Sequence, residues 1–240
     1  MILYLSSSPC VVGADRARIN PDNVFLHNLK SDLLPNPRCL YIASSPDAPD
    51  LNLRYSGDMA DAFREAGMPF GALKILQRST MKHAETLVQW SDFIILAGGH
   101  VPTQNAFFRE LKLGRLLTDY KGVIMGISAG TMNCAGMVYA QPECPGESLD
   151  PAYQRFLPGL SLTYLNILPH YQQVKDDILD GQRLFEDITY KDSFGHSFLV
   201  LPDGSYVRAD GRDSVLFGEA YLLEDSMMRQ ICRNHESIIL

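Results

Sequence analysis

The sequence predicts an α/β protein built on a three-layer, mostly parallel sheet with helices on both faces. Short apolar runs of strand type recur along the first half of the chain, separated by segments with helical spacing. The runs are almost uniformly apolar, as expected of strands that are covered on both sides. After residue 160 the runs follow one another closely, which predicts that the C-terminal third adds antiparallel strands.

Five apolar runs predict the parallel strands, at residues 2–6, 39–43, 72–76, 93–97 and 123–126. The segments between them can serve as crossover helices. A helix over 58–66 ends at Gly67, a residue type that commonly terminates helices. Further helices are predicted over 80–90 and 104–117. This alternation is typical of parallel strands joined by helices.

The segment 141–159 contains four prolines, two glycines and three carboxylates. It is predicted to be an irregular excursion over the surface. Beyond it, strands are predicted at 161–167, 197–201, 205–208, 214–217 and 220–223. Asp203 and Gly204 lie between two of these runs, and Asp-Gly is a strong indication of a two-residue hairpin.

Composition limits the class of protein. The chain has 240 residues, 46% of them hydrophobic, with 21 Lys and Arg against 28 Asp and Glu and a net charge of −7. These values exclude disordered, collagen-like and disulfide-scaffold proteins. No run of basic residues and no stretch of roughly 18 apolar residues is present, so neither nucleic acid nor membrane is an expected partner. Without a repeat or a long linker, a single domain over 1–240 is predicted.

The cysteines indicate a reducing compartment. Five are present, widely spaced and without a C-x-x-C pair. This pattern favours reduced thiols over disulfides or a zinc site. The apolar N-terminus has no basic residue ahead of it and is predicted to be the first buried strand rather than a signal peptide. A cytoplasmic protein is therefore expected.

A strand running into G-x-S-x-G is the most informative motif. Residues 123–130 read Val-Ile-Met-Gly-Ile-Ser-Ala-Gly and are followed by a helix-compatible stretch over 131–139. In a nucleophile elbow the serine occupies a sharp turn, so that the positions two residues away must be glycine. Ser128 is therefore a candidate nucleophile, and the N–H of Ala129 is a candidate oxyanion donor. The alternative is a glycine-rich turn with an incidental serine.

A serine nucleophile needs a base. Of the six histidines, His170 directly follows a strand-like run, which places it at a strand end, where the sites of α/β proteins lie. His100 and His196 are rivals for this role. His100 stands beside a glycine pair and could instead contact substrate, and His196 could be an ordinary surface residue.

The remaining two parts of such a site are an orienting carboxylate and a second oxyanion donor. Asp203 follows a predicted strand, although Asp-Gly is also common in turns without catalytic meaning, and Glu143 and Glu147 are weaker rivals. Two glycines, Gly98 and Gly99, follow the run 93–97 and can let a backbone N–H approach a substrate closely. Gly99 is therefore a candidate for the second donor. No phosphate-binding glycine motif is present.

Four motifs together resemble a known family. L-A-G-G at 96–99, G-I-S-A-G at 126–130, L-P-H-Y at 168–171 and L-P-D-G-S-Y at 201–206, in that order and spacing, resemble the peptidase E (α-aspartyl dipeptidase) and cyanophycinase family. The similarity is specific from about residue 90 to 208. It implies a serine peptidase on a glutamine-amidotransferase-like fold with a flavodoxin-like core.

The resemblance also implies roles. Carried over by motif, Ser128 is the nucleophile, His170 the base and Asp203 the third member of the triad. The N–H groups of Gly99 and Ala129 form the oxyanion hole. No metal or organic cofactor is implied, and the expected partner is a small peptide substrate; a homodimer is left open.

Substrate contacts are expected around these residues. His100, Thr103 and Gln104 stand where the dipeptidase continues Gly-Gly-Asn-Thr and should alter the pocket. Tyr171, beside the predicted base, is counted among the substrate-binding residues. Arg183 lies where the family has a mobile loop able to bind a substrate carboxylate.

The implied activity is exopeptidase cleavage of dipeptides with N-terminal Asp or a related acidic residue. Glu143 and Glu147 would repel such a substrate if they faced the site. Two alternatives remain, a cyanophycinase-like hydrolase of β-aspartyl peptides and a non-catalytic binding protein on the same scaffold. Glutamine amidotransferases carry Cys at the elbow, so Ser128 argues against that class, and Cys134 is predicted to point elsewhere.

Overall fold

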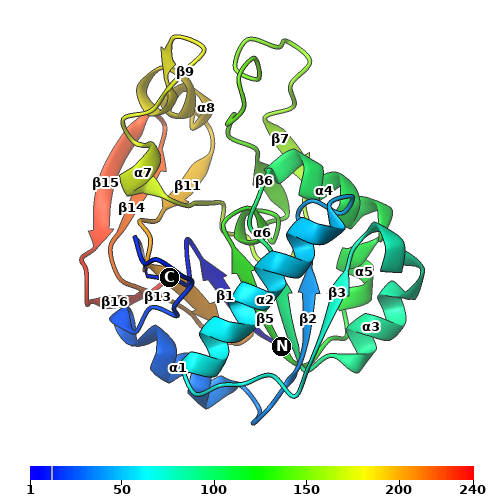
Figure 1. The fold of residues 1–240 in the computed structure, drawn as a ribbon. Helices are drawn as coiled ribbons and strands as arrows, with labels where there is room; N and C mark the ends of the chain where they lie inside the picture. Colours follow the sequence, from blue (N-terminus) through cyan, green and yellow to red (C-terminus); the bar gives the residue numbers. More distant parts are fainter. Residues whose placement is uncertain (12) are drawn as a thin grey trace.

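The computed structural model describes residues 1–11 and 13–240. Its main sheet has the strand order β16-β13-β12-β1-β5-β4-β2-β3 (Figure 1). Five strands are parallel to one another: β1 (Ile2–Ser6), β2 (Arg38–Ile42), β3 (Ala72–Leu76), β4 (Phe93–Leu96) and β5 (Val123–Ile127). Three antiparallel strands extend it beyond β1: β12 (Tyr206–Ala209), β13 (Ser214–Phe217) and β16 (Ser237–Ile239).

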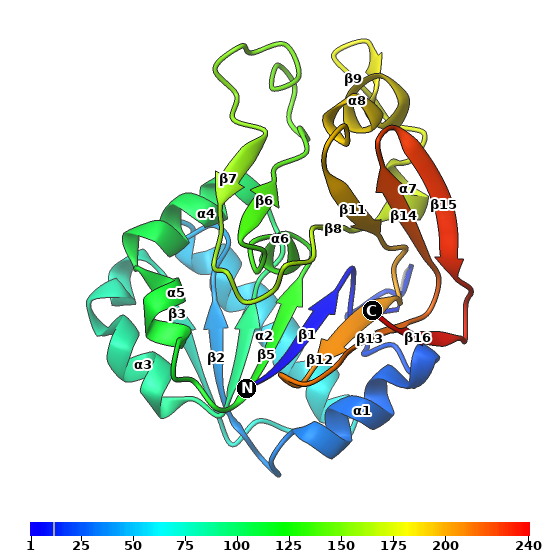
Figure 2. The same cartoon turned by 180° about the vertical axis from the view of Figure 1, so that it is seen from behind.

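Helices cover both faces of this sheet, which confirms the predicted three-layer α/β class (Figures 1 and 2). One face is covered by α1 (Phe25–Asp32) and α2 (Pro49–Glu65), the other by α3 (Ala84–Trp90), α4 (Val101–Glu110) and α5 (Leu113–Leu117). Alternate residues of a strand point to opposite faces. Along β4, Phe93 and Ile95 accordingly pack with α2, and Ile94 and Leu96 pack with the helices opposite.

A second, four-stranded sheet lies beside the first. It comprises β8 (Ile167–Leu168), β11 (Ser197–Val200), β14 (Ala220–Glu224) and β15 (Met227–Cys232), in the order β15-β14-β11-β8. The prediction of C-terminal antiparallel strands is confirmed, but these strands divide between two sheets. A third apolar cluster links this sheet to the end of the main one through Phe198, Ala129 and Val101.

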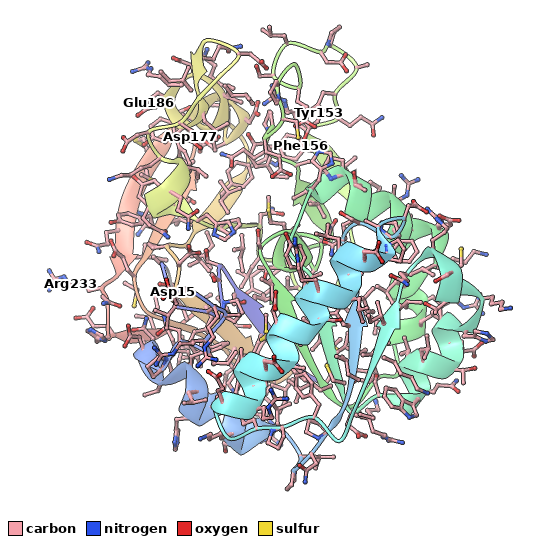
Figure 3. All side chains as sticks on the ribbon, viewed as in Figure 1. Asp15, Tyr153, Phe156, Asp177, Glu186 and Arg233 are labelled. Carbon is pink, nitrogen blue, oxygen red and sulfur yellow. The ribbon has the colours of Figure 1, made fainter. Side chains whose placement is uncertain are left out.

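Two arms rise above the strand ends (Figure 1). One contains β6 (Met137–Tyr139) and β7 (Phe156–Pro158), which pair and carry residues 140–155 between them. The other contains α7 (Tyr171–Val174), β9 (Ile178–Leu179), β10 (Gln182–Arg183), a π-helical turn (Leu184–Thr189) and α8 (Tyr190–Asp192). Figure 3 labels Tyr153 and Phe156 on the first arm and Asp177 and Glu186 on the second.

Some predicted elements coincide with the structure and others do not. The strands over 2–6, 72–76 and 214–217 match in full. The predicted helix over 80–90 begins as a 3-10 turn (Arg78–His83) and continues as α3. A 3-10 turn (Asp22–Val24) also lies directly before α1. The helix over 58–66 is only the second half of α2, which begins at Pro49. Proline is well placed at a helix start because its missing N–H would have no partner there.

Three local predictions were wrong. Over 131–139 the chain leaves α6 (Ala129–Met132) almost at once and enters β6. Over 161–167 most of the segment is not a strand, because N–H groups at 162 and 163 donate to the Cys134 carbonyl instead of a neighbouring strand. Asp203-Gly204 forms a turn but no hairpin, since β11 and β12 belong to different sheets.

Within the described residues, no helix has the length and apolar character that a membrane crossing requires. The longest helix, α2, has 17 residues and carries charged side chains such as Arg54 and Asp58.

Candidate active site

A cavity of about 370 Å³ lies where the ends of β4 and β5 meet the two arms. Its walls include Gly99, Ser128 and His170, together with the carboxyl-bearing residues Glu143 and Asp177. Gly99 and Ser128 follow the carboxyl ends of parallel strands, the edge of an α/β sheet where ligands bind. The structure thus brings the predicted nucleophile, base and one oxyanion donor into the lining of one cavity.

Ser128 stands in a strained turn. Its backbone angles are φ 51° and ψ −113°, outside the regions that non-glycine residues favour. The flanking glycines are required: a Cβ on Gly126 would lie 2.7 Å from the Cα of Thr131, and one on Gly130 would lie 2.2 Å from the Leu96 carbonyl. This geometry confirms the sharp turn that G-x-S-x-G predicts.

The end of β1 holds the turn in place. The Ser128 N–H lies 3.1 Å from the Ser6 carbonyl and 3.2 Å from the Ser7 carbonyl. The Thr131 hydroxyl also donates to the Ser6 carbonyl, at 2.8 Å. The Ser128 hydroxyl does not cap the N-terminus of α6, and it lines the same cavity as His170. In unliganded enzymes the hydrogen bond from nucleophile to base is often long.

His170 is paired with Asp203. The ring Nδ1 lies 2.7 Å from the Asp203 Oδ1. The Asp203 side chain is only 2% exposed, whereas that of His170 is 29% exposed. A carboxylate bound at Nδ1 fixes the orientation of the ring and leaves Nε2 free to accept a proton. A base and its orienting group are arranged in this way.

Asp203 is held by a network that the sequence did not reveal. The Ser7 hydroxyl donates to Oδ1 at 2.7 Å, and the side-chain amides of Gln172 and Gln173 donate to Oδ2 at 2.7 and 2.6 Å. Burial alone raises the pKa of Asp203, but the hydrogen bonds from His170, Ser7 and Gln172 outweigh it and hold the pKa below its usual value. The carboxylate is therefore ionised at neutral pH.

In the sequence, only their positions could have pointed to Ser7, Gln172 and Gln173 as partners of Asp203. Ser7 directly follows the first predicted strand, and Gln172 and Gln173 closely follow the predicted base. Polar residues at a strand end are common, so these positions alone do not identify partners. The Ser7 hydroxyl also accepts the His170 N–H at 2.7 Å, which connects β1 to the base.

Of the two predicted oxyanion donors, Ala129 directly follows Ser128 in the chain, and Gly99 lines the same cavity as Ser128. Gly99 lines the cavity with φ 151°, and a Cβ there would lie 2.5 Å from the Ser44 hydroxyl, so only glycine fits. Ala129 is the first residue of α6, where backbone N–H groups have no partner within the helix. With four residues, α6 offers a much smaller dipole than the helix expected from the sequence.

The residues predicted to bind substrate are more scattered. His100 and Thr103 bond to each other, with Nδ1 and Oγ1 2.7 Å apart. Gln104 is fully buried and donates to the Ala97 carbonyl at 2.7 Å. The Tyr171 ring packs against Phe185 and Tyr221. The guanidinium of Arg183 forms a two-pronged ion pair with Asp187, at 3.0 and 2.9 Å.

None of these five predicted side chains belongs to the lining described for the cavity, and their roles in substrate binding stay predictions. The rival base His196 stacks on Phe156, with ring centroids 4.2 Å apart, and also lies outside this lining. Of the rival carboxylates, Glu143 lines the cavity, and Glu147 lies 2.8 Å from the His100 Nε2. Cys134 is buried and donates to the Gly130 carbonyl.

The two arms contact each other above the cavity. Asp180 accepts hydrogen bonds from the Gly146 N–H at 2.8 Å and from the Ser148 hydroxyl at 2.6 Å. The Ser148 and Gly146 hydrogen bonds lower the pKa of Asp180. This contact connects the arm of residues 140–155 to the β9–β10 turn.

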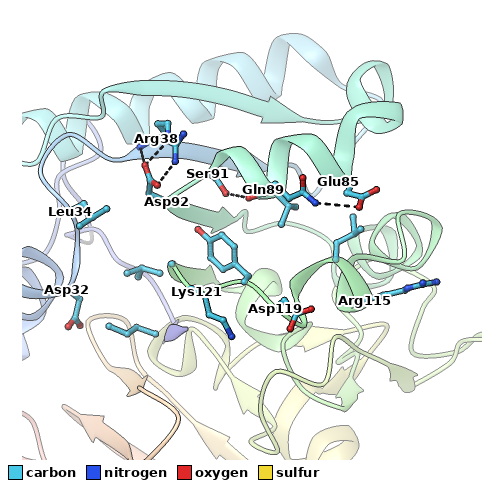
Figure 4. A pocket seen from close by; sticks show the side chains of 16 residues that line it. Asp32, Leu34, Arg38, Glu85, Gln89, Ser91, Asp92, Arg115, Asp119 and Lys121 are labelled. Atoms are coloured by element: carbon cyan, nitrogen blue, oxygen red, sulfur yellow. Dashed lines mark hydrogen bonds and ion pairs between the residues drawn. The ribbon is translucent and has the colours of Figure 1, made fainter.

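A larger cavity, of about 730 Å³, lies at the opposite edge of the sheet, near the amino ends of the strands (Figure 4). Arg38 and Asp92 face each other across two hydrogen bonds of 2.9 and 2.7 Å, and the Ser91 hydroxyl donates to the Val88 carbonyl. Arg38, Asp92 and Ser91 are thus engaged with one another or with the backbone, and the lining described for this cavity contains none of the three predicted catalytic residues. The carboxyl edge therefore carries the candidate active site.

Comparison with known proteins identifies the family. Residues 18–216 match the family model described as peptidase family S51. A search of curated protein sequences gives no match.

Two solved structures share the fold. A peptidase from an acI-B1 Actinobacterium has a TM-score of 0.64 and 17% identity over all of this chain and 96% of that one. A protein assigned as peptidase E from Listeria monocytogenes EGD-e has a TM-score of 0.59 and 14% identity over 96% of this chain and 98% of that one.

Proposed function

Because the chain belongs to peptidase family S51 and is a serine peptidase, we propose that it hydrolyses short peptides through Ser128, His170 and Asp203. The observation that carries the proposal is the pairing of a cavity-lining His170 with a buried, ionised Asp203, in the same cavity as a serine held in a strained turn. Nucleophile, base and orienting group are the three parts that an unactivated serine requires.

In the proposed reaction the Ser128 hydroxyl attacks the peptide carbonyl while His170 takes its proton. Asp203 keeps the imidazole in the required tautomer and stabilises the imidazolium. The N–H groups of Gly99 and Ala129 bind the oxyanion, and each such donor contributes about 3 kcal/mol to stabilising the transition state. His170 then gives the proton to the leaving amine, and water releases the acyl group by the same steps.

The size of the cavity supports short substrates. Its volume of about 370 Å³ is at the lower end of the range for small-molecule sites, which suits a dipeptide or a slightly longer peptide. The two arms that line it are joined by the hydrogen bonds from Gly146 and Ser148 to Asp180.

For the substrate itself, the resemblance to peptidase E favours dipeptides with N-terminal Asp or a related acidic residue. A β-aspartyl substrate, as in cyanophycinases, is a variant of the same proposal. Arg183 would have to leave Asp187 to bind a substrate carboxylate, since the ion pair occupies its guanidinium.

A second candidate is a substrate with a cationic group, and the cavity lining favours it. Glu143 and Asp177 bring two carboxylates into the lining, and no Lys or Arg is among the lining residues described. Removal from water raises the pKa of Glu143, and a cation bound beside the carboxylate would lower it again. The free ammonium of a peptide, or a basic side chain, matches this charge.

One experiment tests both the mechanism and the substrate class. Wild type and Ser128→Ala are assayed with dipeptides whose first residue is Asp, Glu, Asn, isoAsp, Lys or Arg, and labelling by a fluorophosphonate probe is mapped by mass spectrometry. Ser128→Ala should lose activity at least about a thousandfold, with labelling confined to Ser128 in the wild type. The preferred dipeptide distinguishes the acidic from the cationic substrate class.

The control is Ser197→Ala, which removes an exposed hydroxyl on β11 and should keep full activity and labelling. The same thermal unfolding midpoint for all three proteins shows that the fold is intact. Full dipeptide turnover by folded Ser128→Ala would refute the mechanism. A folded wild type that neither labels nor cleaves any dipeptide would indicate a binding protein instead.

A further inference from the structure

Three metal-ligating side chains converge next to the active site. His100 precedes α4, while Cys144 and Glu147 lie in the arm of residues 140–155. One ligand atom from each, a ring nitrogen, the thiol sulfur and a carboxylate oxygen, lie within 4.8 Å of one another. Cys144 is exposed, and His100 and Glu147 are half-buried, so an ion could reach them from solvent.

The donor set matches zinc. Zn²⁺ binds imidazole nitrogen, thiolate and carboxylate oxygen, and around a tetrahedral ion these atoms lie about 3.2–3.7 Å apart. The His100 Nε2 and Glu147 Oε1 are 2.8 Å apart and would have to separate by a few tenths of an ångström. The thiol would have to approach by a similar amount or somewhat more. Because Cys144 belongs to an exposed loop, such movements need no repacking of the core.

Two further contacts orient the ligands. The Thr103 hydroxyl lies 2.7 Å from the His100 Nδ1, and such a partner on one ring nitrogen directs the other toward a metal. The Glu147 Oε2 accepts the N–H groups of Glu143 and Cys144, both at 2.9 Å, which leaves Oε1 for an ion. In the tautomer that carries its proton on Nδ1, beside the Thr103 hydroxyl, the Nε2 lone pair points to the Glu147 Oε1 side, where an ion would lie between the two atoms.

We propose that His100, Cys144 and Glu147 form a Zn²⁺ site with a fourth position open to water. The ion takes no part in cleaving the peptide bond. It fastens the arm of residues 140–155 to the segment that begins with Gly99, and so fixes the position of Glu143 at the cavity. The site rests on the position of these three side chains and does not depend on the identity of the nucleophile.

The test measures metal binding to the full-length protein after dialysis against a chelator. Zn²⁺ is titrated by calorimetry, and Co²⁺ is added as a spectroscopic substitute. Wild type should bind one Zn²⁺, and Co²⁺ should produce a thiolate-to-metal charge-transfer band and the intense visible bands of tetrahedral coordination. Cys144→Ser should abolish the charge-transfer band and weaken Zn²⁺ binding at least about tenfold. His100→Gln should weaken Zn²⁺ binding by a similar factor.

The control is Cys10→Ser, which removes another cysteine that is not fully buried and should leave the stoichiometry, affinity and band unchanged. Thermal unfolding in chelator confirms that each variant is folded. The proposal is overturned if wild type binds no Zn²⁺, or if Cys144→Ser binds it as tightly as wild type. Since neither readout involves peptide cleavage, failure of the metal site can be told from failure of the proposed peptidase mechanism.

Discussion

At the scale of single residues, Ser7 connects the parts of the site that the chain separates most widely. Its hydroxyl donates to the Asp203 carboxylate and accepts the backbone N–H of His170, both at 2.7 Å. Its carbonyl accepts the N–H of Ser128 at 3.2 Å. Ser7 is completely buried, so it cannot exchange these partners for water. It is a positioning residue that fixes the carboxylate and the base relative to the nucleophile.

Ser7→Ala should therefore impair catalysis more than folding. Loss of a hydrogen bond to a charged group costs about 1.5–3 kcal/mol, which corresponds to a decrease in kcat of roughly tenfold to a hundredfold, with little change in KM. Because the variant removes one of the hydrogen bonds that lower the pKa of Asp203, the pKa of this carboxyl should rise. The control is Ser8→Ala, whose hydroxyl forms hydrogen bonds with the backbone of Cys10 and is not bonded to Asp203 or His170. Wild-type kcat in Ser7→Ala would contradict the positioning role.

The residues that perform the proposed chemistry could be selected from the sequence, but those that hold them could not. Ser128, His170 and Asp203 each sit in a local motif whose geometry is set by adjacent residues, such as the glycines around Ser128. Ser7 pairs with Asp203 across 196 positions. No local pattern encodes such a pairing, since any of several serines after β1 could have supplied it.

At the scale of elements, the junction of β5 and α6 depends on close approach to β4. A Cβ on Gly130 would lie 2.2 Å from the Leu96 carbonyl and 2.7 Å from its carbon. Backbone atoms at the centre of a sheet cannot move aside as a flexible side chain can. The elbow is thus fixed by packing against the neighbouring strand as much as by its own dihedral angles.

Gly130→Ala should destabilise the protein by about 3 kcal/mol or more and abolish activity, because the overlap displaces Ser128 or β4. The matched control is Gly57→Ala in the middle of α2, where nothing lies within 4 Å of the new Cβ. That change should stabilise the protein by about 0.5–1 kcal/mol. Chemical denaturation measures both, and equal effects of the two substitutions would show that the contact with Leu96 is unimportant.

The elements also show where local patterns fail. The buried strand β1 and the edge strand β3 are encoded by their own mostly apolar runs and were predicted in full. The pairing of β11 and β12 was mispredicted because Asp203-Gly204 specifies only a turn, in which Gly204 has φ 89°. Whether a turn joins two paired strands or two different sheets is decided by distant partners, here β1 for β12 and β8 for β11.

At the scale of the whole molecule, one ion pair joins the first helix, the first strand and the C-terminal strands. Asp32 at the end of α1 binds Arg208 of β12 through hydrogen bonds of 2.7 and 3.0 Å, and the buried Tyr4 of β1 donates its hydroxyl to the same carboxylate. The Asp32 side chain is 10% exposed. The antiparallel extension that carries Asp203 is thereby fastened to the parallel part of the sheet.

This contact makes stability depend on pH in a defined direction. Burial raises the pKa of Asp32, but hydrogen bonds from Arg208 and Tyr4 outweigh it and hold the pKa below its usual value. The unfolded chain therefore takes up the proton first, and the stabilisation is complete above about pH 4 and is lost as the pH falls through the folded-state pKa. Asp32→Asn should lower the free energy of unfolding by about 1–3 kcal/mol at pH 7.

The difference between wild type and Asp32→Asn should shrink as the pH is lowered from about 4 toward 2, because the wild-type carboxylate is then protonated too. Urea denaturation across this pH range measures the free energy of unfolding of both proteins. Subtracting one from the other removes the contribution of the other acidic groups that titrate in the same range. The control is Asp15→Asn, an exposed carboxylate whose loss should change stability by less than about 0.5 kcal/mol at any pH. If the difference in the free energy of unfolding between wild type and Asp32→Asn stays constant with pH, Asp32 acts through packing and not through its charge.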